Sequence, residues 1–411
     1  MKTDVLIIGG GMCGVLTAHK LKEAGVDCVI VEGKTVGGGV TQNTTAKITA
    51  QHGLIYADLI ARFGTEKARQ YYDANTQAIS SYCGLATRFP CDFEEKTAYV
   101  YTTDDRHKLN READAYQKIG IPAKIVDMPQ LPLSTVGAIA MEQQAQFHPL
   151  KLLYELANCL DIYEHTFVHK LEGNTAHTSG GKITAQYIIL ATHFPLVNLR
   201  GLYFMKLYQH RSYVFALKNA PLLDGMFIDG RENGLSFRTY GDMLFVGGGD
   251  HRTGKTGGDY AELTQFTKHA YPCATVAHRW ATQDCMTLDK VPYVGLHRMK
   301  NVYFATGFNK WGMTGSMAAA ERLAELIVHG DSNARGDIYY PGRSMLSRQL
   351  FVNLGAAAAG LLSPGGKRCT HMGCKLHRNA AENTWDCACH GSRFDQQGHV
   401  IQNPAKKNLK R

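Results

Sequence analysis

Apolar runs and helical patterns alternate through the first part of the chain. Residues 4–9 form a short apolar run that ends in glycine, which predicts a buried parallel strand entering a tight turn. Residues 12–24 carry apolar positions at helical spacing, and residues 28–31 predict a second strand that ends at Glu32. This succession of strand, helix and strand predicts a βαβ unit.

The rest of the pattern divides the chain into a large α/β part and a small C-terminal part. Helices are predicted at 53–86, 108–119 and 315–329, and strands at 98–102, 182–191, 213–217, 235–239, 243–246 and 302–305. Residues 330–346 are rich in Gly, Asp, Ser, Arg and Pro, which indicates a linker before an Ala-rich helix at 350–362. The last 48 residues have cysteine, histidine and glycine but little helical pattern.

Composition and charge narrow the class of protein. A chain of 411 residues with 44% hydrophobic and 20% charged residues is an ordinary globular protein of two or three domains. The net charge of +9 includes a basic C-terminal end, for which a solvated tail is the preferred interpretation over a docking patch for an acidic partner. No cleavable leader and no membrane-spanning run is visible, so we expect a cytoplasmic protein without a nucleic-acid partner or transmembrane segment.

The eleven cysteines are unevenly placed. Seven stand singly between Cys13 and Cys285, as expected for thiols in a reducing compartment. The other four crowd together near the C-terminus, at Cys369, Cys374, Cys387 and Cys389. In a cytosolic enzyme such a cluster favours a metal site over disulfides.

The first turn carries a dinucleotide-binding motif. Gly9, Gly11 and Gly14 satisfy G-x-G-x-x-G between a predicted strand and a predicted helix. The first glycine makes the turn, the second admits the pyrophosphate, and the third lets the helix approach the strand. Glu32 stands where an acidic residue binds ribose hydroxyls. The motif predicts a bound dinucleotide but does not distinguish FAD from NAD.

Three further segments favour FAD. A strand at 302–306 enters Gly307, then Gly312 and Gly315 open a long helix, and residues 188–193 form another strand ending in small residues. Together with the motif, these segments resemble the D-amino acid oxidase family over residues 1–330. The resemblance implies an FAD-binding domain (about 1–85, 150–200 and 286–330) interleaved with a substrate domain (about 86–149 and 201–285). It also implies that Thr44, Thr45, Val168, Gly307, Gly312 and Gly315 contact the cofactor.

The C-terminal cysteines stand beside two histidines. Cys369 and His371 form C-x-H, and Cys387 and His390 form C-x-x-H fifteen residues later. A Cys₂His₂ zinc site is one interpretation, but zinc sites usually space their cysteine pairs two to four residues apart, so C-x-H paired with C-x-x-H is unusual for zinc.

This motif resembles the Rieske iron–sulfur family, which implies a [2Fe–2S] cluster with Cys369 and Cys387 on one iron and His371 and His390 on the other. It also implies a disulfide between Cys374 and Cys389 and a hydrogen bond from Ser392 to the cluster. The module, expected at 363–411 after a linker and short helix at 331–362, lacks the strands that usually precede the first ligand loop. The predicted fold is therefore α/β: a Rossmann-like FAD-binding domain, an interleaved α+β substrate domain and an abbreviated all-β Rieske module.

Candidate catalytic residues lie near predicted strand ends. Arg238 could clamp a substrate carboxylate, His251 could act as a base, and Gln283 with Asp284 could line the pocket. A structural role is at least as good an interpretation of Arg238, an equally good one of Asp284 and a better one of His251. The predicted function is a dehydrogenase that oxidises a small organic donor, an amine, amino acid or hydroxy compound, and passes electrons from FAD to the cluster and an unidentified external partner. The alternative is a non-catalytic electron carrier or redox sensor.

Overall fold

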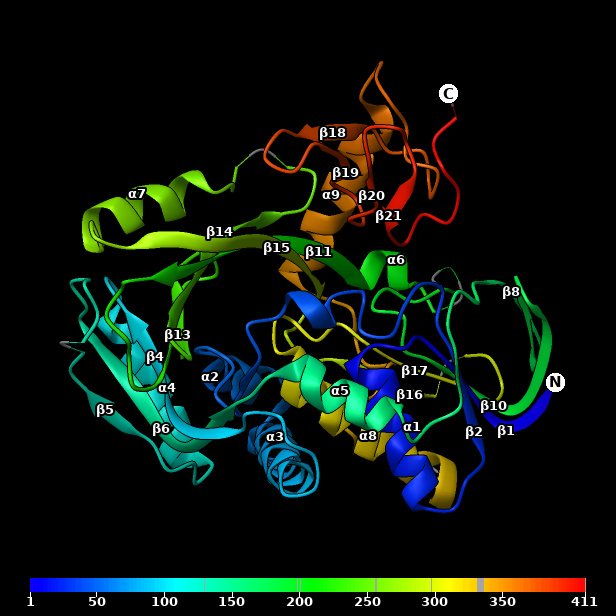
Figure 1. Cartoon of the computed structure of the whole chain (residues 1–411), viewed down its shortest axis with the longest axis horizontal. Coiled ribbons are helices and arrows are strands. Elements are labelled where there is room, and N and C mark those ends of the chain that lie inside the picture. The colour runs from blue at the N-terminus through cyan, green and yellow to red at the C-terminus, as the bar shows by residue number, and fades with distance from the viewer. Residues whose placement is uncertain are drawn as a thin grey trace.

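Three β-sheets organise the chain (Figure 1). The computed structural model describes residues 1–128, 130–197, 199, 201–255, 257–296, 298–330 and 336–410, so residues 331–335 of the predicted linker and Arg411 lie outside the described residues. The sheets have eight, nine and four strands, and the last is confined to the C-terminal part. This arrangement confirms the predicted fold class of a mixed α/β protein with a small all-β C-terminal module.

The eight-stranded sheet has a parallel centre. Its order is β16-β17-β10-β1-β2-β7, and the hairpin β8–β9 joins it through β10. The five strands β7, β2, β1, β10 and β17 run parallel to one another, whereas β16 is antiparallel to β17 and β9 is antiparallel to β10. The bounds are β1 (Lys2–Ile8), β2 (Cys28–Val31), β7 (Ile162–Tyr163), β8 (Val168–Glu172), β9 (Thr175–Thr178), β10 (Gly181–Leu190), β16 (Tyr293–Leu296) and β17 (Val302–Thr306).

Helices cover this sheet, and its strands β2 and β17 are buried along their whole length. Helix α1 (Met12–Glu23) connects β1 to β2, and α8 (Gly312–His329) packs on α1 and on α3 (Thr65–Ala86). Helices α2 (Tyr56–Phe63) and α5 (Pro149–Ala157) complete this layer. The predicted helix at 53–86 is two helices, α2 and α3, because Gly64 adopts a φ of +86° between them.

The nine-stranded sheet is mostly antiparallel. Its order is β15-β11-β14-β13-β12-β4-β6-β3, with β5 paired to β6. The bounds are β3 (Lys47–Ile48), β4 (Glu94–Thr102), β5 (Lys124–Val126), β6 (Gly137–Gln146), β11 (Leu207–Lys218), β12 (Met226–Asp229), β13 (Ser236–Tyr240), β14 (Met243–Arg252) and β15 (Thr275–Thr287). Because these strands alternate along the chain with those of the first sheet, the two sheets are interleaved as predicted.

Short helices flank the second sheet. They are the 3-10 helix η1 (Thr41–Asn43), α4 (Arg106–Lys118), α6 (Tyr203–Lys206) and α7 (Ala261–Ala270). Figure 1 shows the long strands β11, β14 and β15 running beneath the C-terminal module. The C-terminal module therefore lies over the second sheet.

The C-terminal module is a four-stranded antiparallel meander. Strands β18 (Leu376–Asn379), β19 (Thr384–Cys387), β20 (Arg393–Phe394) and β21 (Val400–Gln402) pair in sequence order. Helix α9 (Arg348–Leu362) precedes them, and the Ser347 side chain caps it by accepting from the Leu350 N–H. The core of the module is small: four cysteines, Leu376, Phe394 and Ala405. None of the helices in the described part of the chain is long and apolar enough to cross a membrane.

Candidate functional site

A cavity of about 950 Å³ lies where the three sheets meet. Its wall takes Gly9 and Gly11 from the first turn, residues 37–45 from the following loop, and Trp311 and Gly312 from the start of α8. Strands β11 and β15 contribute further residues, and residues 400–406 of the C-terminal module close part of the wall. The volume is that of a site for a cofactor or a large small molecule.

The first turn leaves no room for side chains. Gly9 has a φ of +119°, and a Cβ there would stand 2.5 Å from the Ala191 carbonyl oxygen. A Cβ on Gly14 would stand 1.9 Å from the Gly9 carbonyl oxygen, whereas Gly11 borders the cavity itself. Helix α1 begins directly after Gly11, so its N-terminal dipole favours an anion at this point. These residues fit the pyrophosphate of a dinucleotide.

The other predicted cofactor residues divide into two groups. Glu32, Thr44, Thr45, Val168 and Gly312 line the cavity. The Glu32 carboxylate accepts from the backbone N–H groups of Gly10 and Lys34, at 2.8 Å each, which holds it at the end of β2.

Gly14, Gly307 and Gly315 are not among the described residues that line the cavity. A Cβ on Gly307 would stand 2.2 Å from Thr287 Cγ2, and one on Gly315 would stand 2.8 Å from the Phe308 ring. Their local role is close packing behind the wall, and a direct contact with the cofactor stays a prediction.

The four predicted cluster ligands lie together at one end of the C-terminal module. Cys369, Cys387 and His390 are at most 4% exposed, and the His371 and His390 ring centroids are 5.0 Å apart at 86°. The Nδ1 atom of His390 is buried and has no hydrogen-bond partner in the described part of the chain. A buried ring nitrogen of this kind fits a metal ligand, since an unpaired polar atom would otherwise be costly.

The protonation of these groups also suits ligation. Burial lowers the pKa of His390 to about 3 and that of His371 to about 4, so both imidazoles are neutral. The hydrogen bond shared by the two thiols lowers the pKa of Cys369 and raises that of Cys387. Two neutral imidazoles and two closely spaced thiols form a donor set that fits a mixed nitrogen–sulfur cluster.

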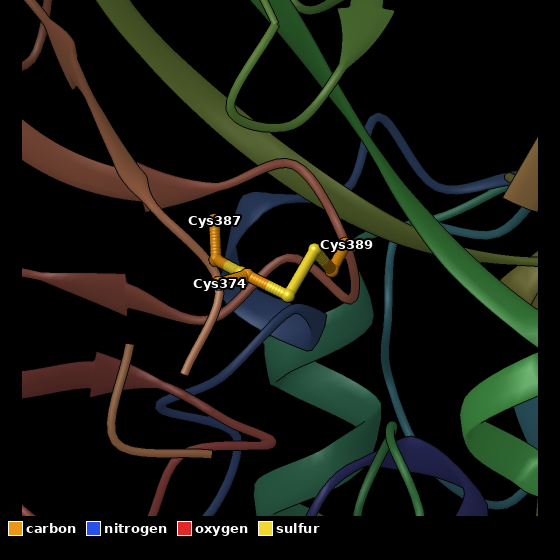
Figure 2. A group of neighbouring side chains, drawn as sticks. All are labelled: Cys374, Cys387 and Cys389. Atoms are coloured by element: carbon orange, nitrogen blue, oxygen red, sulfur yellow. A yellow bond between two sulfur atoms is a disulfide. The ribbon is translucent and has the colours of Figure 1, made fainter. Parts of the chain in front are cut away.

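A disulfide joins the two loops that carry these residues. Cys374 and Cys389 are bonded, and their sulfur atoms and that of Cys387 lie within 4.8 Å of one another (Figure 2). Gly360 of α9 packs against this disulfide, because a Cβ there would stand 2.8 Å from Cys389 Sγ. The helix thus supports the loops from behind.

Polar side chains of the second sheet hold the cluster loop. Gln209 Nε2 donates to the His390 carbonyl and Gln283 Nε2 donates to the Gly391 carbonyl, both at 2.8 Å. Arg252 donates to the carbonyl oxygens of Ala388 and Cys389, at 2.9 and 3.1 Å. These bonds tie the loop to β11, β14 and β15.

A buried ion pair adds to this interface. Arg211, 1% exposed, forms a bidentate pair with Glu382 of the C-terminal module. Arg393 also contacts Glu382, at 3.0 Å, and Asp386, at 3.1 Å. The charges of the two arginines are therefore matched by the two acids.

The structure gives the three predicted catalytic residues other contacts. Arg238 is 2% exposed and donates to the carbonyl oxygens of Thr45, Ala46 and Phe147, so its guanidinium braces the cofactor loop. The His251 ring stacks on Tyr213, and Gln283 bonds the cluster loop. None of the three belongs to the described residues that line the cavity. A catalytic role for them stays a prediction without support from these contacts.

Other polar residues do reach the cavity. Asp284, which the sequence raised only as a possible lining residue, is joined there by His210, Asp250 and Lys310. Sequence reasoning missed His210 and Lys310 because neither stands in a motif. Lys310 follows the glycine turn after β17, and His210 pairs with Asp284 across β11 and β15. Only the pairing of the strands brings these residues together.

Two protein families match the chain. One, described as FAD dependent oxidoreductase, matches residues 4–326, and the Rieske [2Fe-2S] domain matches residues 347–411. The chain belongs to the FAD dependent oxidoreductase family. It is an oxidoreductase of that family with a C-terminal Rieske domain, and its cofactors are FAD and a [2Fe–2S] cluster. The alternative of a structural zinc site is set aside by the Rieske match.

Several known proteins are similar to most of this chain. The Bacillus subtilis protein YhfW, named for a Rieske 2Fe-2S centre, is 35% identical over 99% of this chain and 92% of its own. Gamma-glutamylputrescine oxidoreductase of Escherichia coli is 22% identical over 86% of this chain and 91% of its own. Among solved structures, glycine oxidase from Geobacillus kaustophilus has a TM-score of 0.68 at 20% identity, covering 80% of this chain and 96% of its own. L-proline dehydrogenase from P. horikoshii has a TM-score of 0.69 at 18% identity, covering 83% and 97%.

Proposed function

We propose that this oxidoreductase oxidises a small organic donor at FAD and passes the electrons through its Rieske cluster to an external one-electron acceptor. The proposal rests on the shared wall of the cavity. Residues 400–406 of the cluster module line the same cavity as residues of the first turn and of the second sheet. Such a wall supports transfer within one molecule, because both cofactors would be held by contiguous packed structure.

We propose that Gly9, Gly11, Gly14, Glu32, Thr44, Thr45, Val168, Gly307, Gly312 and Gly315 hold FAD. We further propose Cys369, His371, Cys387 and His390 as cluster ligands, with the domain boundaries at about residues 330 and 363. When bound, FAD supplies acceptance of an electron pair and the cluster supplies passage of single electrons. The chain's own residues position the two sites relative to each other, through the bonds of Gln209, Gln283 and Arg252 to the cluster loop.

One chain of contacts leads from the cavity to the cluster module. His193 lines the cavity, and its Nε2 atom lies 3.2 Å from Gln209 Oε1. Gln209 in turn donates to the carbonyl of His390, a proposed ligand. This continuous contact supports electron transfer in the direction from flavin to cluster or in the reverse direction.

The names of similar proteins suggest the class of donor. They refer to glycine, L-proline and gamma-glutamylputrescine, which share an amine nitrogen. Oxidation of an amine removes a hydride from the C–H bond and a proton from the nitrogen, two electrons and two protons in all, and leaves an imine. We therefore propose an amine or amino acid as the donor, ahead of a hydroxy compound.

Anaerobic photoreduction tests the electron path. The protein holding both cofactors is illuminated to reduce the flavin, and the cluster is followed by electron paramagnetic resonance. We expect the signal of a reduced Rieske cluster to appear as flavin absorbance recovers. A flavin that stays reduced beside an oxidised cluster would overturn the proposal. Protein lacking the cluster through His390→Ser should keep its flavin reduced and serves as the control.

A further inference from the structure

Four side chains form a polar group on the cavity wall. Asp284 of β15 and His210 of β11 are cross-strand partners, and Asp250 of β14 and Lys310 of the turn before α8 complete the group. They come from four different elements and all line the cavity. We call them the β15 polar group.

Two members of this group form an ion pair with each other, and a third is uncharged. Lys310 Nζ donates to Asp250 Oδ1 at 2.8 Å and to the Glu232 carbonyl at 3.0 Å, and the Ser212 hydroxyl also donates to Asp250. His210 is neutral, since burial first and Lys310 second lower its pKa to about 3. Its Nδ1 atom is buried without a hydrogen-bond partner in the described chain.

Asp284, the fourth member of the group, differs from the others. Its carboxylate has no hydrogen bond or ion pair to the described residues, although it borders the cavity. Arg211, the other nearby cation, is already paired with Glu382. Burial raises the pKa of Asp284 to about 6, and it is still mostly ionised at neutral pH. The β15 polar group therefore presents to the cavity one negative charge that no described residue pairs by a hydrogen bond or an ion pair.

We propose that Asp284 anchors the protonated amine of the substrate, so that this enzyme takes a cationic amine and needs no substrate carboxylate. The inference rests on the proposed function and specifies its substrate class. A half-buried carboxylate without a partner is costly, and a ligand ammonium group removes that cost by a charge-assisted hydrogen bond. The same carboxylate would repel a substrate carboxylate placed beside it.

Most cations that line the cavity already have an acidic partner. Lys310 is paired with Asp250, Arg211 with Glu382 and Arg231 with Asp229. Lys47 also lines the cavity, but its Nζ donates to Thr45 Oγ1 at 3.1 Å, in the loop proposed to hold FAD. We assign Lys47 to the cofactor side on that ground. His210 Nδ1 remains as a further hydrogen-bonding atom beside Asp284.

Three probes of matched size test the proposal: benzylamine, benzyl alcohol and benzoate, which are cationic, neutral and anionic at neutral pH. Each is titrated anaerobically into the protein holding both cofactors, and perturbation or bleaching of the flavin spectrum reports binding. We expect benzylamine to bind at least about tenfold more tightly than either analogue, as for a hydrogen bond between charged groups.

Variants of Asp284 locate the preference. In Asp284→Asn the preference for benzylamine over benzyl alcohol should fall to about onefold, and Asp284→Glu should retain it. Asp242→Asn, an exposed change on the turn between β13 and β14, is the matched control and should bind as the natural protein does. Unchanged flavin content and thermal stability show that each variant is folded.

Three results would overturn the proposal. They are benzoate binding as tightly as benzylamine, benzylamine causing no spectral change, and Asp284→Asn keeping the amine preference. Failure of the proposed function looks different, because the amine would then bind or bleach the flavin while the cluster stays oxidised.

Discussion

The cluster site and the flavin cavity are built in opposite ways. All four proposed cluster ligands come from residues 369–390, at the two ends of the hairpin β18–β19 and in the loops beside it. The cavity collects its wall from the first turn, the second sheet, the start of α8 and the C-terminal module. A site made by one short segment can be identified from spacing, whereas a site made by many segments depends on how the sheets pair.

The two regions also differ in what stabilises them. The flavin part has large cores that include most buried apolar residues of the chain, while the core of the cluster module contains four cysteines and few other residues. Its stability therefore depends on the cluster, the disulfide and the polar interface with the second sheet. Four changes test this contrast, from the largest expected effect to the smallest.

Loss of a cluster ligand should abolish one site and spare the other. In His390→Ser we expect no Rieske signal in electron paramagnetic resonance and less than one-tenth of the iron and acid-labile sulfide, because the second iron loses a ligand. FAD content should be unchanged. His377→Ser alters an exposed histidine of the same module and should keep the signal. A normal signal in His390→Ser would remove this histidine from the ligand set.

The converse change is Gly11→Val. A Cβ at this position would lie 3.3 Å from Thr41 Oγ1, and the larger branched side chain would extend into the cavity where the pyrophosphate is proposed. We expect FAD affinity to fall at least a hundredfold, about 3 kcal/mol, in equilibrium titrations of the apoprotein. The cluster signal should persist. Gly84→Ala, a helical position with open space around it, should bind FAD normally.

Breaking the interface tests whether the module is stable by itself. Arg211→Met leaves Glu382 partly buried with Arg393 as its remaining cationic partner, so we expect a loss of about 3 kcal/mol in unfolding free energy and faster proteolytic release of the module. The double variant Arg211→Met/Glu382→Met removes both charges and should recover much of that loss. Equal stability of all three proteins would mean that the module folds independently of the second sheet.

Removal of the disulfide should have the smallest effect. In Cys374→Ser/Cys389→Ser, which opens a loop with a sequence separation of 15, we expect a loss of about 2 kcal/mol seen as earlier thermal bleaching of the cluster. The g values of the reduced cluster should not change, because the two residues are tethers in our assignment. Shifted g values would make them ligands. Cys273→Ser, at an exposed free cysteine, is the control.

Much of this protein was predictable from local pattern. The βαβ unit, the glycines at its first turn and the helices α1, α8 and α9 follow from spacing that one segment contains. The two residues of C-x-H, and likewise those of C-x-x-H, are only two or three positions apart, so each predicted pair is close in space whatever the rest of the fold. Arg238 and Gln283 could not be judged in the same way, since their partners are backbone groups far away in the sequence, and His251 stacks on Tyr213 of another strand.

The sequence by itself determined the fold class, the two cofactors and the residues proposed to hold the cluster, because glycine turns and ligand spacings are short-range constraints. Only the tertiary structure decided which polar groups line the cavity and which brace its wall. Gln283 and Asp284 are neighbours on β15, yet one holds the cluster loop and the other borders the cavity. Successive side chains of a strand point to opposite faces, so the placement of the sheet gives each residue its role.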